Sequence, residues 1–232
     1  MTSASTGSPS TTAPNTIGLL GGTGPAGRGL ARRLSAAGYD IIIGSREEVR
    51  GREVANEIER DLHGSSGSIR GGDNREAAAA ELVVMAAPWV AALGLSETFA
   101  EQLEGKTVVS MVNALTRVGR TFMPLTLPRG SVAAELQARM PGAHVIGAFH
   151  HLPADELGDL GHALACDVLV YGDDDRARHG AMTLVERIAG LRAIDVGTLT
   201  AAGAVEAMTA VLIQVNVRYR THSMVRLIGD FE

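Results

Sequence analysis

A glycine-rich turn near the start of the chain contains the residues with the clearest chemical use. Gly22, Gly24 and Gly27 follow the spacing G-x-G-x-x-G directly after a short apolar run, 17–21. Gly22 permits a tight turn, Gly24 lets the backbone approach a pyrophosphate, and Gly27 lets the next helix pack against the strand. Free N–H groups and the helix dipole favour a phosphate there. We expect the whole turn to bind a dinucleotide, with a purely structural turn as the alternative: Gly22, Thr23, Gly24, Pro25, Ala26 and Gly27.

The end of the next expected strand distinguishes NAD from NADP. An NAD site places Asp or Glu about 20 residues after the glycines, where the carboxylate bonds the ribose hydroxyls. This chain has Ser45 and Arg46 there, with Arg50 one helical turn later. A guanidinium pairs with the 2′-phosphate of NADP, and the hydroxyls of Thr23 and Ser45 can complete the pocket. We therefore expect NADP(H). The alternative is that Arg46 pairs on the surface with the two glutamates that follow it.

The elements that must position these residues alternate between strand and helix. Apolar runs predict strands at 17–21, 40–45, 68–71, 82–86, 107–112 and 143–149, and helices at 24–37, 47–62, 75–80 and 89–103. Further strands at 168–172 and 191–196, a helix at 175–189 and a final helix at 201–228 follow. This order predicts an α/β protein with a Rossmann-type, doubly wound parallel sheet and a smaller C-terminal α/β portion. We expect a disordered lead-in at 1–15, an NADP-binding domain at 16–152 and a small C-terminal domain at 153–232.

Composition excludes several classes of function. A net charge of −5 and 3% aromatic residues indicate no nucleic-acid partner. The one cysteine, Cys166, rules out an internal disulfide and a cysteine-ligated zinc site, and fits the reducing cytoplasm. The lead-in lacks the apolar core of a signal peptide. No apolar run is expected to approach the roughly 20 residues that span a bilayer, so we expect no membrane partner.

Two further segments follow expected strands at their carboxyl ends, where such sheets bind ligands. Pro88, which precedes Trp89, can present a flat contact to a nicotinamide ring, or it can simply end a strand beside a core tryptophan. His150 and His151 are adjacent on a strand and so point to opposite faces, and no cysteine or carboxylate cluster completes a metal site. One of these histidines either lines the ligand crevice or bonds to the backbone.

Taken together, the segments resemble the F420-dependent NADP oxidoreductases, also called NADPH-dependent F420 reductases, from Thr16 to the end of the chain. The resemblance rests on Leu19 to Gly24, Gly44-Ser45-Arg46, Pro88-Trp89, the His-x-x-Pro-Ala element at His150 to Ala154, Gly172 to Asp175, and Gly190-Leu191-Arg192 followed by Asp195 and Gly197. These elements occur in the order and near the spacing of the family. Two pairs depart from it: Pro25-Ala26 stands where members often have Asn-Leu, and Val90-Ala91 where many have Glu-His.

The resemblance implies direct hydride exchange between nicotinamide C4 and C5 of coenzyme F420, a 5-deazaflavin, with no catalytic residue of the protein's own. It implies that Thr23, Gly24, Pro25, Ala26, Ser45, Arg46 and Arg50 hold NADP, and that Pro88, Val112, Ala114 and Ala154, with Asn113 in the same segment, surround the stacked rings. It implies further that His150, Leu152 and Pro153 shape the deazaflavin pocket and that Leu227, on the last helix, closes it.

Two other functions fit the same dinucleotide site. One is a reductase of a small carbonyl or imine, which usually has a catalytic lysine on a long helix; the one lysine here, Lys106, precedes an expected strand instead. The other is a non-catalytic NADP(H) sensor. The long apolar last helix packs either on the first domain or on a second subunit, and the resemblance favours a homodimer.

Overall fold

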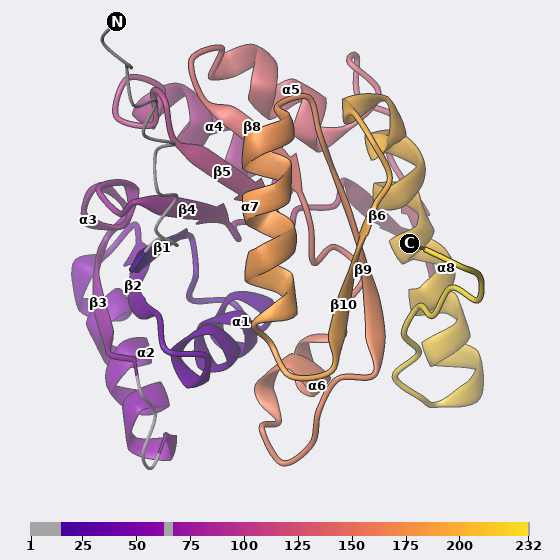
Figure 1. Cartoon of the computed structure of the whole chain (residues 1–232), viewed down its shortest axis with the longest axis horizontal. Helices are drawn as coiled ribbons and strands as arrows, with labels where there is room; N and C mark the ends of the chain where they lie inside the picture. The colour runs from indigo at the N-terminus through magenta and orange to yellow at the C-terminus, as the bar shows by residue number, and fades with distance from the viewer. Residues whose placement is uncertain (1–14, 63–66, 232) are drawn as a thin grey trace, which may run out of the picture.

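The computed structural model describes residues 15–62 and 67–231 (Figure 1). Residues 1–14 of the expected disordered lead-in lie outside this described part. The strands of the main sheet are β1 (Thr16–Leu20), β2 (Asp40–Ser45), β3 (Ile69–Asp73), β4 (Leu82–Met85), β5 (Thr107–Ser110), β8 (His144–Gly147), β9 (Cys166–Gly172) and β10 (Leu191–Asp195). The helices are α1 (Pro25–Ala36), α2 (Glu48–Asp61), α3 (Asn74–Ala78), α4 (Trp89–Phe99), α5 (Val132–Arg139), α6 (Ala154–Gly158), α7 (Asp175–Glu186) and α8 (Ala202–Tyr219), the last preceded by a 3₁₀ turn, η1 (Leu199–Ala201).

The eight strands form one sheet in the order β10-β9-β8-β5-β4-β1-β2-β3. All neighbours pair in parallel except β8 and β9, which are antiparallel. The run β3-β2-β1-β4-β5-β8 has the strand order of a Rossmann sheet, which reverses between β1 and β4. The predicted doubly wound α/β fold is confirmed. Because β8 pairs with β9, the sheet continues across residue 152, and the domain limits stay a prediction.

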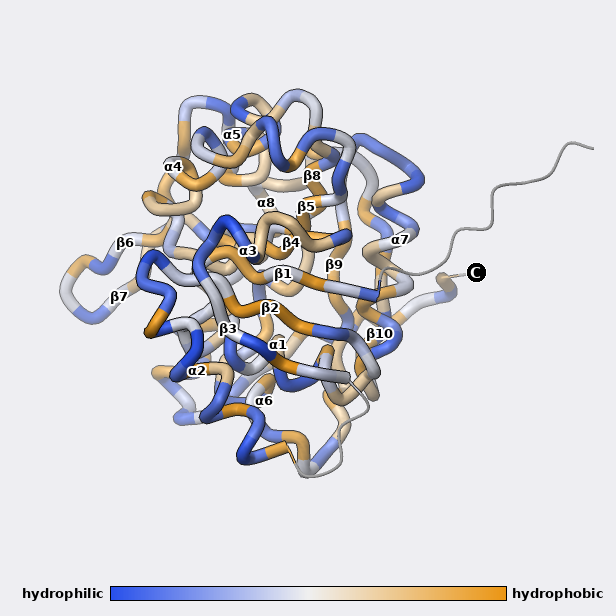
Figure 2. The backbone as a smooth tube through the Cα atoms, turned by 90° about the vertical axis from the view of Figure 1, so that its left-hand side faces the viewer, coloured by the Kyte–Doolittle hydropathy of each residue, from blue (hydrophilic) through white to orange (hydrophobic). Residues whose placement is uncertain are grey.

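Both faces of the sheet are covered by helices, so its strands are apolar on both sides. Ile17 and Leu19 of β1 belong to one hydrophobic cluster, which α1, α2 and α7 cover, whereas Leu20 belongs to another, which α3, α4, α5 and α8 cover. Figure 2 shows the hydrophobic stretches along β1 and β2 in orange. This packing explains why the sequence reads as continuous apolar runs rather than as an alternating pattern.

The segment between β5 and β8 contains elements that the sequence did not predict. A two-stranded hairpin, β6 (Leu115–Val118) and β7 (Thr121–Pro124), turns at Gly119, whose φ is +61°. The helix α5 follows, and its N-cap Ser131 accepts a hydrogen bond from the N–H of Ala134. The hairpin packs against α8 rather than joining the main sheet.

The last helix is shorter than predicted, and the expectation that it extends to residue 228 is wrong. α8 ends at Tyr219 because Arg220 adopts the left-handed conformation with a φ of +53°. The chain then returns along β9, where the N–H of Asp167 donates to the carbonyl of Val225 at 2.8 Å. Leu227 therefore lies in a C-terminal tail and not on the last helix.

The expectation that no apolar run approaches membrane-spanning length is also wrong. Among the described residues, Leu199–Tyr219 is a helix of 21 residues that is long and apolar enough to cross a membrane by length and composition, and 28% of its most apolar window is buried. Its buried Glu206 accepts hydrogen bonds from the N–H groups of Val132 and Ala133, at 2.8 and 3.0 Å, at the start of α5. α8 is thus tied to the sheet domain by a carboxylate in its first half.

Candidate functional site

A crevice of about 1020 Å³ opens along the carboxyl ends of β1, β2, β4 and β5, where open α/β sheets bind ligands. β6 and α8 supply the opposite wall through Leu115, Thr209 and Ile213. The volume lies at the upper end of the range for small-molecule sites, which is about 300–1,000 Å³. Asn74, directly after β3, also lines the crevice. The other lining residues lie at the ends of the four strands or in the segments that follow them: Gly21, Thr23, Gly24, Pro25, Ala26, Gly27, Ser45, Arg46, Glu47, Arg50, Ala86, Ala87, Pro88, Trp89, Ala91, Gly94, Leu95, Met111, Val112 and Asn113.

The glycine turn leaves room for a phosphate at one end of the crevice. Gly24 is the N-cap of α1 without a side-chain cap, and a Cβ added there would meet nothing within 4 Å. The first N–H groups of α1 are thus available to a ligand, although Pro25 at the first helical position supplies none. A Cβ at Gly27 would lie 2.6 Å from the carbonyl oxygen of Gly22, so glycine is needed there for close packing.

The tight turn depends on a different glycine from the one predicted. The left-handed residue is Gly21, with a φ of +66°, and not Gly22. Its N–H donates to Oδ1 of Asn74 at 3.0 Å, so this asparagine holds the turn from the start of α3. Arg28 holds it from α1, since its Nε donates to the carbonyl of Thr23 at 2.9 Å. Sequence reasoning missed Asn74, which also lines the crevice, because it belongs to a segment more than fifty residues away.

Two exposed arginines mark the end of the crevice at β2. Arg46 lines it and, within residues 15–62 and 67–231, forms no ion pair with an acidic side chain. The alternative that Arg46 pairs with the glutamates after it is not what the structure shows, because Glu48 pairs with Arg52. Arg50 faces the same end and lies 3.2 Å from Glu53. A free guanidinium in the same crevice as the N-terminus of α1 is suited to a phosphate monoester.

The other half of the crevice has no titratable side chain among its described lining residues. Pro88 ends the segment after β4 and is the N-cap of α4, and Val112 follows β5. Asn113 donates from Nδ2 to the carbonyl of His150 at 2.8 Å. The hydroxyl of Thr209 donates to that carbonyl and to Oδ1 of Asn113, both at 3.2 Å. One backbone carbonyl therefore orients two polar side chains that face the cavity.

His150 itself is buried in a hydrogen-bond network beneath this half. Its Nε2 lies 3.0 Å from the hydroxyl of Tyr171, on which its ring stacks. The same hydroxyl donates to Oε1 of Glu206 at 3.4 Å. Burial, with a smaller contribution from His151, lowers the pKa of His150 to about 3, and burial raises the pKa of Glu206. The imidazole is thus neutral at physiological pH and ties β8, β9 and α8 together.

Known proteins are similar to this chain in sequence and in fold. Residues 16–114 match the family model for coenzyme F420-dependent NADP oxidoreductases. The chain is 37% identical over 213 residues to the F420-dependent NADP reductase of Methanocaldococcus jannaschii, and this match covers 88% of the chain and 94% of that protein. The chain belongs to this family.

Other members of the F420-dependent NADP oxidoreductase family match at similar length. The F420-dependent NADP reductase of Methanothermobacter marburgensis is 34% identical over 210 residues, covering 88% of this chain and 93% of that protein. A crystal structure from Arthrobacter sp. FB24, described as a candidate F420-dependent NADP-reductase, superposes with a TM-score of 0.79 at 26% identity and covers 94% of this chain and 100% of that one. The family model thus spans the crevice-lining residues from Gly21 to Asn113, and the full-length matches cover most of the chain.

The structure brings most of the predicted site residues together but not all of them. Those that line the crevice are Thr23, Gly24, Pro25, Ala26, Gly27, Ser45, Arg46, Arg50, Pro88, Val112 and Asn113. Those that do not line it are Gly22, Ala114, His150, Leu152, Pro153, Ala154 and Leu227. Gly22 bonds to the backbone of β1 and β2, and Ala114, His150 and Leu152 are buried. Leu227 lies on the tail, where its N–H donates to the carboxylate of Asp167 at 2.6 Å.

Proposed function

We propose that this protein catalyses reversible hydride transfer between NADP(H) and coenzyme F420: reduced F420 + NADP⁺ = oxidised F420 + NADPH + H⁺. The observation that carries the proposal is a crevice with two unlike halves, in a chain of the F420-dependent NADP oxidoreductase family. One half offers helix N–H groups and unpaired arginine charge, as a phosphorylated dinucleotide requires. The other half offers apolar and amide groups without a general acid or base, as a direct transfer between two rings requires.

The residues of the chain then bind and orient the reactants. The bound nicotinamide and deazaflavin supply the hydride donor and acceptor. Arg46, Arg50 and Ser45 hold the 2′-phosphate, and the first turn of α1 holds the pyrophosphate. Pro88 and Val112 form an apolar surface for the rings and keep water away from them. Asn113 and Thr209, fixed by the carbonyl of His150, supply polar groups that set the orientation of the rings.

Mixing the protein with NADPH and oxidised F420 tests the proposal directly. We expect the visible absorbance and the fluorescence of the deazaflavin to bleach in the presence of NADPH, and much more slowly with NADH. Tight binding of NADPH without bleaching would favour a non-catalytic sensor. The lysine-dependent alternative receives no support from Lys106, whose Nζ donates to the carbonyls of Ala78 and Ala80 and lies outside the crevice.

We also propose that the protein is cytoplasmic and forms a homodimer. Much of α8 and of the tail that follows it faces solvent, with Ile228 99% exposed, and a second subunit can cover part of this apolar surface. Light scattering after size-exclusion chromatography is expected to give a mass of about 48 kDa, twice the 24.2 kDa of the chain. A mass near 24 kDa at micromolar concentration would contradict the dimer.

A further inference from the structure

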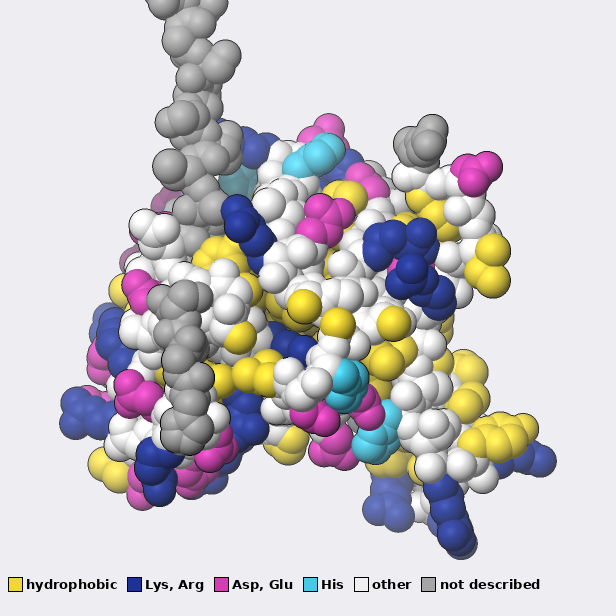
Figure 3. Space-filling model, turned by 60° about the horizontal axis from the view of Figure 1, so that its bottom comes forward, with side chains coloured by type: hydrophobic (Ala, Val, Ile, Leu, Met, Phe, Trp, Pro, Cys, Tyr) yellow, Lys and Arg dark blue, Asp and Glu magenta, His cyan; other side chains and the backbone are white. Residues whose placement is uncertain are grey.

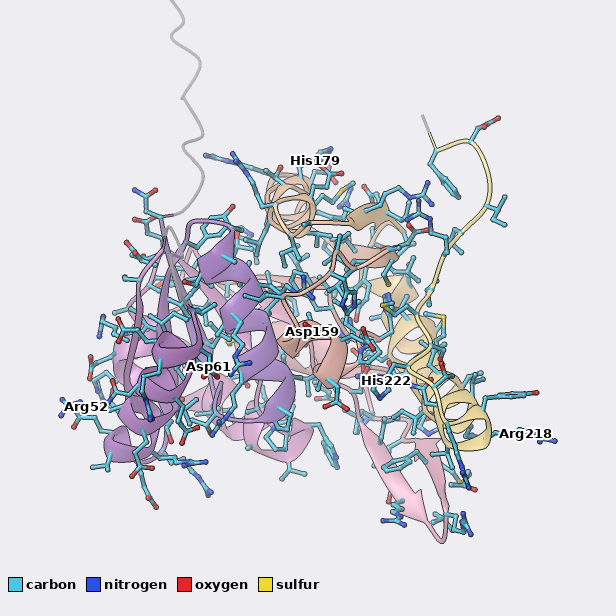
Figure 4. All side chains as sticks on the ribbon, turned by 90° about the horizontal axis from the view of Figure 1, so that it is seen from below. Arg52, Asp61, Asp159, His179, Arg218 and His222 are labelled. Atoms are coloured by element: carbon cyan, nitrogen blue, oxygen red, sulfur yellow. The ribbon has the colours of Figure 1, made fainter. Side chains whose placement is uncertain are left out.

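A second hollow lies beside the crevice, between the β6–β7 hairpin and the C-terminal half of α8. Its volume is about 410 Å³. Its walls are Arg120 and Thr121 of the hairpin and, from α8, Val211, Gln214, Val215, Val217, Arg218 and Tyr219, so that two arginines flank a mainly apolar floor. We call it the arginine groove. The two walls are held together where Nε2 of Gln214 donates to the carbonyl of Phe122 at 3.4 Å. Figure 4 shows Arg218 at the end of α8.

Two arginines, Arg120 and Arg218, and no acidic residue line the arginine groove, in a chain that is acidic overall. Residues 105–134, which contain the hairpin, include one lysine and three arginines but no aspartate or glutamate. Residues 207–229 include three arginines and again no acidic residue. Arg120 and Arg218 are both exposed, and neither forms an ion pair within the described part of the chain. Figure 3 shows dark-blue side chains gathered at this corner, next to hydrophobic ones.

The arginine groove continues from the ring half of the crevice. β6 begins at Leu115, which lines the crevice, and ends at Val118; Arg120, in the turn of the hairpin, lines the groove. On α8, Ile213 faces the crevice and the next residue, Gln214, faces the groove. A strand rises about 3.4 Å per residue, so Arg120 lies roughly 10 Å or more from Leu115 at the rim of the crevice. Arg46 and Arg50 lie at β2, away from the ring half.

The geometry points to the arginine groove as the binding site for the anionic side chain of the deazaflavin. In coenzyme F420 this side chain is flexible and carries a phosphodiester and carboxylates. This inference rests on the proposed function, because that function places the deazaflavin ring in the adjoining half of the crevice. Guanidinium groups pair with both kinds of anion. A second copy of the chain fits the groove poorly, since a two-fold contact centred there would bring the unpaired arginines of both copies together.

Binding of two deazaflavins to a double variant tests the inference. One ligand is F420 and the other is its truncated form, which ends at the ribityl hydroxyl and has neither phosphate nor carboxylates. Dissociation constants are measured by deazaflavin fluorescence, without turnover. For Arg120→Ala/Arg218→Ala we expect the dissociation constant of F420 to rise about tenfold, which is about 1.4 kcal/mol. The dissociation constants of the truncated ligand and of NADPH are expected to stay within twofold of their wild-type values. The wild-type protein is expected to bind F420 more weakly as salt rises, because exposed charges are screened.

The control variant, Arg60→Ala/Arg187→Ala, removes two exposed arginines outside the crevice and the groove, and is expected to bind F420 as the wild type does. Equal binding of both deazaflavins by the wild type, or an equal loss of both in the groove variant, would overturn the inference. So would a change in oligomeric mass in that variant, which would make the groove a subunit contact. Absence of bleaching in the wild type would instead overturn the proposed function. The fluorescence titration would still show whether the groove binds the anionic side chain.

Discussion

Replacing Arg46 with alanine is expected to raise the KM for NADPH by about 10- to 100-fold. The guanidinium of Arg46 is exposed at the β2 end of the crevice and, in the described part of the chain, has no acidic partner to lose. A hydrogen bond to a charged group contributes about 1.5–3 kcal/mol, and each 1.4 kcal/mol corresponds to a factor of ten. The KM for NADH, which lacks the 2′-phosphate, should change less than threefold. Steady-state bleaching of F420 with each nucleotide gives both constants.

Two variants control for this result. Arg46→Lys keeps the charge but loses the two-pronged geometry, so an intermediate KM is expected. Arg52→Ala removes an arginine of α2, the helix that begins two residues after Arg46. Arg52 pairs with Glu48 and does not line the crevice, so both nucleotides should behave as in the wild type. An equal loss with NADH and NADPH in Arg46→Ala would show that the arginine acts on the shape of the turn and not on the phosphate.

The phosphate end of the crevice could be predicted because its signals are local in the sequence. Gly24 and Gly27 lie in the turn and the helix that follow β1, and Ser45 and Arg46 lie at the end of β2. The carboxyl ends of these neighbouring parallel strands meet at one edge of the sheet. The identity of each residue then follows from backbone geometry or from charge. The tight turn is the exception. Three of the four residues at 21–24 are glycines, and the G-x-G-x-x-G spacing alone does not show that Gly21 takes the positive φ.

The ring half could be predicted only in part because long-range packing builds it. Thr209 and Ile213 reach the crevice from α8, about a hundred residues after β5, and no spacing in the sequence signals that approach. The orientation of the His150 side chain could not be predicted from the sequence either. Phe149 adopts a φ of +66°, an uncommon conformation for a bulky residue, and His150 is buried on Tyr171. The family pattern located this segment correctly after β8, but its side-chain directions depend on β9 and α8.

This buried histidine links the stability of the fold to the orientation of the crevice. A Cβ on Gly147 would lie 2.0 Å from the ring of Tyr171, so glycine in β8 makes room for the ring on which His150 stacks. The carbonyl of His150 holds Asn113 and Thr209 on the other side. Protonation of His150 is therefore expected to disturb Asn113 and Thr209 as well, because both side chains bond to the carbonyl of this residue.

Acidification from pH 7.5 to 5 is expected to lower the free energy of unfolding by about 2 kcal/mol through His150 alone. Its pKa is about 3 in the folded protein and 6.5 in its ordinary state, so the unfolded chain binds the proton first. The stabilisation is complete above pH 6.5 and is lost at about 1.4 kcal/mol per pH unit as the pH falls toward 3. Burial also lowers the pKa of His151, which adds to the loss in the same direction.

Urea unfolding at pH 7.5 and pH 5 measures this difference for the wild type and for His150→Gln. The glutamine keeps a hydrogen-bonding group but does not titrate, so the variant should be less stable at pH 7.5 and lose about 2 kcal/mol less on acidification. His179→Gln is the matched control, because His179 is exposed on α7 and its ring, among the described residues, bonds only to the carbonyl of Asp175 (Figure 4). If His150→Gln lost as much stability as the wild type between the two pH values, the acid sensitivity would come from other groups. Protonation of the His150 imidazole would then not explain it.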